Sequence, residues 1–86
     1  MARFIVAHPV AFTEEQLAGL AQRKAEIPAG ITWRCSWSGT TDGVGYCEWE
    51  APDAEAVRSV LEANQIPTDA IHEVRYFEPD AGRFTA

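Results

Sequence analysis

Residues 31–51, ITWRCSWSGTTDGVGYCEWEA, contain the pattern on which the prediction of the fold rests. Apolar and polar side chains alternate over 31–37 and again over 45–51, which is typical of β-strands with one buried face. The residues between these runs are rich in turn formers, and Asp42-Gly43 is a strong hairpin signal. The stretch is therefore predicted to form a β-hairpin.

The pairing of the two hairpin strands is expected to keep like faces together, because a slip of one residue would mix them. The register that does so pairs these residues: Trp33 with Trp49, Cys35 with Cys47, and Arg34 with Glu48. The first two pairs belong to the apolar face, and the third is expected to be a cross-strand ion pair. All three tryptophans of the hairpin are then expected to lie in the core beneath the helices.

The flanking segments predict one strand and one helix on each side of the hairpin. Residues 3–8 are mostly apolar and form a central strand that Pro9 ends. Thr13 with Gln16 is a capping box that opens a helix. Asp53 is the N-cap of a second helix, and residues 71–77 form the last strand.

The resulting element order is βαββαβ. Right-handed crossovers place both helices on one face of an antiparallel sheet with strand order 4-1-3-2, which is an α+β, ferredoxin-like arrangement. We expect a single domain over residues 1–78, followed by a tail over 79–86 that is either flexible or docks on a partner subunit. The uncovered sheet face leads us to expect a homodimer.

The composition excludes several classes of partner. Asp and Glu outnumber Lys and Arg by 13 to 7 in the 86 residues, so nucleic acid and anionic membranes are not expected partners. No apolar run approaches the roughly 20 residues of a membrane span, and no secretory signal is expected. The expected location is the cytoplasm. Two cysteines without a CxxC spacing are expected to be reduced core thiols, with a cross-strand disulfide or metal ligation as alternatives.

The ends of the strands suggest a metal site. If the first and third strands run parallel, their ends bring His8, Glu50 and His72 to one end of the sheet. Imidazole and carboxylate ligands together suit nickel, zinc or copper. We therefore expect a divalent metal, nickel or zinc, on His8, Glu50 and His72, with Cys35 as a conditional fourth ligand.

Enzymatic activity is the alternative. A dimeric α/β-barrel enzyme would act on a small hydrophobic organic substrate, with Glu50 or His8 as general base and Tyr46 as a hydrogen-bond donor. A purely structural module is a third option. No nucleophile–base–orienter constellation is visible in the sequence, so a non-catalytic metal- or ligand-binding protein is the leading hypothesis.

A family resemblance points the same way. It is carried by these segments: Tyr46-Cys47, Glu50-Ala51-Pro52, Asp53-Ala54-Glu55-Ala56-Val57, Ile66-Pro67, Ile71 and Glu73-Val74. They resemble a family of short bacterial proteins of unknown function that includes an actinobacterial nickel-binding protein. The resemblance implies a ferredoxin-like fold, a dimer and divalent-metal binding. His8 resembles a histidine at the end of the first strand in that member, but Pro9 replaces a second histidine, and Cys35 stands where that member carries a histidine.

Overall fold

Up to residue 74, the order of strands and α-helices along the chain is the predicted βαββαβ, but the predicted strand 71–77 is divided and two further strands follow. The computed structural model describes residues 1–85. Its elements are β1 (Ala2–His8), α1 (Glu14–Ala21), a 3-10 turn (Lys24–Glu26), β2 (Thr32–Ser38), β3 (Gly45–Ala51), α2 (Ala54–Ala63), β4 (Ala70–Val74), β5 (Tyr76–Glu78) and β6 (Arg83–Thr85). No helix among these residues has both the length and the apolar character needed to cross a membrane.

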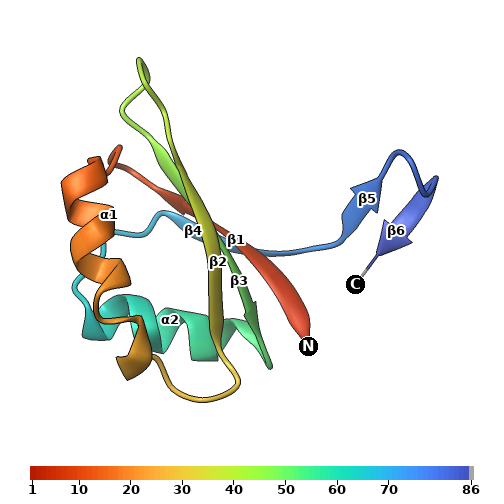
Figure 1. Ribbon diagram of the computed structural model, residues 1–86, viewed down its shortest axis with the longest axis horizontal. Helices are drawn as coiled ribbons and strands as arrows, with labels where there is room; N and C mark the ends of the chain where they lie inside the picture. The colour runs from red at the N-terminus through yellow and green to blue at the C-terminus, as the bar shows by residue number, and fades with distance from the viewer. Residues whose placement is uncertain (86) are drawn as a thin grey trace.

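The main sheet has the predicted topology. Within residues 1–85 its strand order is β2-β3-β1-β4, which is the predicted 4-1-3-2 order read from the other edge. Both helices lie on one side of it, as Figure 1 shows. The predicted ferredoxin-like α+β class is therefore confirmed.

One part of the topological prediction was wrong. β1 and β3 run antiparallel, with His8 opposite Gly45 and Arg3 opposite Glu50. In a βαββαβ chain each helix joins two strands of the same direction, so β1 matches β2 and β3 matches β4. The central pair must then be antiparallel, and the ends of β1 and β3 that were expected to meet lie at opposite ends of the sheet.

The hairpin register also differs from the prediction after its first pair. Trp33 does lie opposite Trp49, but a bulge between Trp33 and Cys35 places Cys35 opposite Glu48 and not opposite Cys47. A bulge sets two residues against one, so every following side chain of β2 changes face. Trp37 therefore lies on the open face with 51% of its surface exposed, and the prediction that it fills the core was wrong.

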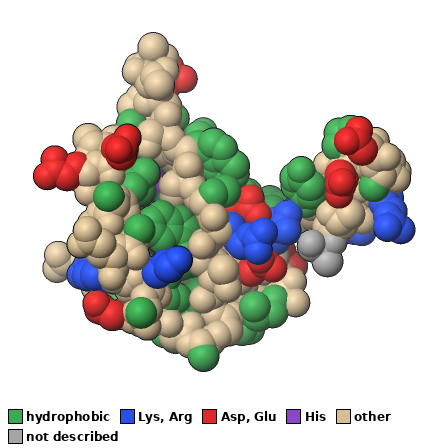
Figure 2. Space-filling model, in the orientation of Figure 1, with side chains coloured by type: hydrophobic (Ala, Val, Ile, Leu, Met, Phe, Trp, Pro, Cys, Tyr) green, Lys and Arg blue, Asp and Glu red, His purple; other side chains and the backbone are tan. Residues whose placement is uncertain are grey.

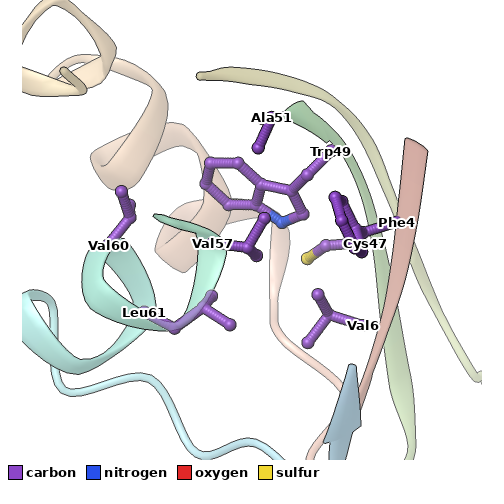
Figure 3. Close-up of a cluster of buried hydrophobic side chains, with 8 residues drawn as sticks. All are labelled: Phe4, Val6, Cys47, Trp49, Ala51, Val57, Val60 and Leu61. Carbon is purple, nitrogen blue, oxygen red and sulfur yellow. The ribbon is translucent and has the colours of Figure 1, made fainter. Parts of the chain in front are cut away.

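The core lies between α2 and the sheet, as Figure 3 shows. The buried residues come from β1, β3 and α2: Phe4, Val6, Cys47, Trp49, Ala51, Val57, Val60 and Leu61. α2 starts where predicted, because Asp53 accepts a hydrogen bond from the backbone N–H of Ala56 at 2.9 Å. The predicted capping box opens α1, but Leu17 and Leu20 are only half-buried. α1 therefore covers the sheet less closely than α2 does.

The chain after β4 forms a separate hairpin. The last strand of the main sheet ends at Val74, and β5 pairs with β6 in a second, two-stranded sheet. This hairpin stands apart from the main sheet, on the side away from the helices (Figure 1). Phe77 and Phe84 pack edge to face with their ring centroids 5.5 Å apart. Residues 79–85 of the predicted tail are thus partly β-structure, and its docking on a partner stays a prediction.

Candidate functional site

His8 lies on the helix-facing side of β1 and is only 1% exposed. It pairs with Gly45, whereas Glu50 pairs with Arg3, five residues earlier on β1. At about 3.4 Å per residue these positions are roughly 17 Å apart along the strand. The structure therefore does not bring His8 and Glu50 together, because the juxtaposition rested on the wrong strand directions.

Both ring nitrogens of His8 have partners. Nδ1 lies 2.8 Å from the carbonyl oxygen of Pro67 and donates its proton to it, and in this tautomer Nε2 is the acceptor. Cys47 Sγ lies 3.1 Å from Nε2 and donates its thiol proton there. Burial raises the pKa of the Cys47 thiol, although its hydrogen bond with Ser36 acts in the opposite direction, so the thiol keeps its proton for this role.

The hydrogen-bonded chain continues past Cys47. Ser36 Oγ lies 3.0 Å from Cys47 Sγ, and the indole N–H of Trp33 donates to the same Oγ at 2.9 Å. The β2 bulge makes this contact, because it turns Ser36 toward the helix-facing side. Sequence reasoning missed Cys47 as the partner of His8. The available signal was the alternation of β3, which predicts Cys47 on the buried face.

The other three candidate metal ligands, Cys35, Glu50 and His72, lie on the open face of the sheet, and Cys35 and His72 share a row there with Glu48. Cys35 is opposite Glu48, Glu48 is opposite Ile5, and Ile5 is opposite His72, so these residues form one row across four strands. Cys35 Sγ lies 3.8 Å from Glu48 Oε1. His72 is two strands away from Glu48, about 9–10 Å at the usual strand spacing. The row thus holds a thiol, a carboxylate and an imidazole on one surface.

Two ion pairs neutralise the carboxylates of this face. Glu48 Oε2 lies 3.2 Å from Arg3 Nε, and Glu50 Oε1 lies 2.9 Å from Arg34 Nη1. The predicted pairing of Arg34 with Glu48 was wrong, because the bulge moves Arg34 out of that register. Cys35 keeps its proton, since loss of hydration and the neighbouring Glu48 charge raise the pKa of its thiol.

Two aromatic side chains extend the open face at its β2–β3 edge. Trp37 lies opposite Tyr46, and they are 51% and 43% exposed. Tyr46, a candidate hydrogen-bond donor for catalysis, is thus a surface residue beside another aromatic ring. The open face therefore combines an apolar edge with a row of potential ligands.

A single copy of the chain does not assemble a full metal-ligand set. Among residues 1–85, no group of three or more His, Cys, Asp or Glu side chains lies close enough to hold a metal ion. Cys35 and Cys47 are both free thiols and lie on opposite faces of the sheet. On the open face, Cys35 and Glu48 form only a pair.

Comparison with known proteins identifies relatives of the chain. The model of the family described as "Nickel responsive protein SCO4226-like" matches residues 4–74. The crystal structure of SCO4226 from Streptomyces coelicolor A3(2) is similar, with a TM-score of 0.72 and 31% sequence identity over 85% of this chain and 95% of that chain. No curated protein matches the chain significantly. The family resemblance seen in the sequence is confirmed, and the matched region stops before β5.

Proposed function

We propose that this chain, which belongs to the SCO4226-like family of nickel-responsive proteins, is a small non-catalytic protein that binds a divalent metal ion, with nickel as the first candidate. The observation that carries the proposal is the row on the open face. It places Cys35 Sγ 3.8 Å from Glu48 Oε1 and puts His72 on the same surface. Nitrogen, sulfur and oxygen donors of this kind suit nickel and zinc.

A second copy of the chain would complete the ligand set. In a two-fold dimer both copies use the same patch of surface for the interface. His72 of one copy would then lie against the opposite end of the row in the other copy, where Cys35 and Glu48 are located. The exposed rings of Trp37 and Tyr46 give this face apolar surface that a partner would cover. We therefore propose a homodimer through the open sheet face, with metal held between Cys35 and Glu48 of one copy and His72 of the other.

Nickel titration of the chelator-stripped protein tests the site. Nickel at 100 times its Kd is expected to stabilise the folded protein by about 2.7 kcal/mol, seen as a higher melting temperature. Cys35→Ser and His72→Ala are each expected to weaken binding at least tenfold, because each removes one ligand. Calorimetric titrations with nickel, zinc, copper and cobalt measure the affinities and rank the metals.

The matched control is Glu73→Gln, which alters an exposed side chain adjacent to His72 on β4. It is expected to leave the nickel affinity unchanged, because successive residues of a strand point to opposite faces. Sedimentation velocity with and without nickel tests the shared site. A wild-type protein that stays monomeric while it binds nickel would contradict the shared site. Unchanged nickel affinity in both ligand variants would contradict it as well.

The affinity for nickel is expected to rise with pH. The pKa of Cys35 is raised by loss of hydration and by Glu48, while Arg34 and Arg3 act in the opposite direction. Metal binding must displace the thiol proton, so affinity increases by up to about tenfold per pH unit until the thiol ionises without metal. Titrations between pH 6.5 and 8 measure the slope. Cys35→Ser is expected to flatten it, and an equal slope in that variant would exclude Cys35 as a ligand.

A further inference from the structure

Residues 75–85, which contain the β5–β6 hairpin, stand off from the rest of the molecule, and we call this segment the arm. Figure 2 shows it as a lobe beside the main body, with hydrophobic side chains at its surface. Its two strands have three residues each and form a two-stranded sheet. A two-stranded hairpin is at best marginally stable in water unless it packs on another surface. The arm therefore requires a surface to pack on.

The main body of the same chain supplies only part of that surface. Tyr76, Phe77 and Phe84 are 49%, 49% and 50% exposed. Phe77 and Phe84 pack on each other, and the guanidinium carbon of Arg75 lies 4.4 Å from the ring centroid of Phe84. Tyr76 contacts the open face, because the guanidinium carbon of Arg3 lies 5.2 Å from its ring centroid. The arm is thus attached at the edge of the open face, and about half of each aromatic residue stays accessible.

The exposed aromatic area is close to what a stable dimer buries. An aromatic side chain has roughly 150–250 Å² to bury, so a half-exposed one offers about 100 Å². Trp37 and Tyr46 of the open face offer about 200 Å² together, and the three rings of the arm raise the total to about 500 Å². A standard interface buries about 800 Å² per partner, of which about 65%, or roughly 520 Å², is apolar in homodimers. The rings of the open face alone fall short of this area, and those of the arm make up the difference.

The charges favour a second copy of this chain as the partner. The chain has a net charge of −6, so two copies repel each other unless neutral surfaces meet. The open face is one neutral surface, since its two ion pairs balance. The arm is another, with two basic and two acidic residues: Arg75, Glu78, Asp80 and Arg83. A basic partner would instead be attracted to the acidic remainder of the chain.

The place where the arm leaves the sheet decides what it reaches. Four residues form one row across the sheet: Thr32, Glu50, Arg3 and Val74. The arm follows Val74, so it starts at the level of the sheet at which β2 begins. The open-face dimer proposed above sets β4 of one copy over β2 of the other, because it places His72 against Cys35. The arm of one copy then lies beside the first residues of β2 in the other copy.

We propose that the arm is an interaction surface for a second copy of the chain, and that Phe77 and Phe84 pack beside Thr32 and Arg34 of that copy. The proposal rests on the open-face dimer of the proposed function and adds a contact to it. The family model matches residues 4–74, so the arm lies outside the matched region. The contact uses none of the candidate metal ligands and therefore forms without metal.

Sedimentation equilibrium of the full-length, chelator-stripped protein measures the dimer Kd. The double variant Phe77→Ser/Phe84→Ser is expected to raise this Kd at least about 100-fold, because it removes two buried rings from each copy. The matched control is Glu78→Gln/Arg83→Gln, which alters the neighbouring side chains on the opposite side of the arm. It is expected to stay within about threefold of wild type. Circular dichroism of both variants at monomer concentrations checks that the main sheet is intact.

Isotope-filtered NMR on a dimer of one labelled and one unlabelled copy locates the arm. Nuclear Overhauser effects are expected between the ring protons of Phe77 and Phe84 and the Thr32 methyl group of the other copy. Contacts of these rings with residues of their own copy alone would place the arm on its own body and overturn the proposal.

The possible outcomes separate this contact from the proposed function. A Phe77→Ser/Phe84→Ser variant that dimerises as tightly as wild type would overturn the arm contact and leave the open-face dimer in place. A wild-type protein that stays monomeric with and without nickel would overturn both the dimer and the arm contact. A metal-free wild-type dimer that the double variant dissociates would support the arm contact, even if nickel does not bind.

Discussion

Replacing Phe4 with alanine is expected to lower the free energy of unfolding by about 3–5 kcal/mol. Phe4 is 1% exposed in the central strand β1, and it belongs to the buried cluster with Val57 and Leu61 of α2. The variant loses the transfer free energy of the ring and leaves a cavity at the contact between α2 and the sheet. Urea unfolding followed by tryptophan fluorescence measures the change.

The matched control is Phe77→Ala in the β5–β6 hairpin. Phe77 is 49% exposed and contacts the ring of Phe84, so its loss is expected to cost less than about 1 kcal/mol. A small domain has only about 5–15 kcal/mol of stability in total, so Phe4→Leu provides a milder variant if Phe4→Ala does not fold. Equal costs for the Phe4→Ala and Phe77→Ala variants would contradict the placement of the core.

Replacing His8 with alanine is expected to lower the free energy of unfolding by about 2–4 kcal/mol. The imidazole is 1% exposed, and its two nitrogens satisfy the Pro67 carbonyl and the Cys47 thiol. The variant leaves the buried Cys47 thiol and the Pro67 carbonyl without their partner and creates a void beside Phe12, whose ring centroid lies 5.2 Å from that of His8. The same urea unfolding experiment measures the loss.

His72→Ala is the matched control, because His72 is exposed on β4. Its effect on stability is expected to stay within about 0.5 kcal/mol. Nickel binding should show the reverse pattern, with affinity weakened in His72→Ala and retained in folded His8→Ala. Loss of nickel binding without loss of stability in His8→Ala would mean that His8 is a metal ligand and not a core residue.

These variants test which side chains the sheet directs to each of its two faces. The open face carries Cys35, Glu48 and His72, and the helix-facing side carries the His8–Cys47 pair. The side chains of adjacent residues in one strand, such as Glu48 and Trp49, thus point to opposite faces of the sheet. A substitution in one strand can therefore be directed at either face, because successive side chains of a β-strand point to opposite sides of the sheet.

Features that depend on local chemistry were predictable from the sequence. The capping box of Thr13 and Gln16 and the N-cap Asp53 mark the starts of the two helices, because capping involves residues three positions apart. The alternation of β3 placed Cys47 and Trp49 on the buried face, because strand side chains have a period of two. From these elements the βαββαβ order and the fold class follow.

The contacts between distant residues were not predictable from the sequence. The bulge at Arg34 leaves no signal in a period-two pattern, yet it moves Cys35 to the open face and Ser36 toward Cys47. The contact of His8 with Cys47 joins residues 39 positions apart in the chain. Such contacts depend on strand direction and on register. A register error of one residue is enough to move a side chain to the opposite face of the sheet. Local sequence patterns were therefore sufficient to predict the helix caps, the elements of the main sheet and the fold class, whereas the composition of each face of the sheet followed from strand direction and the β2 bulge.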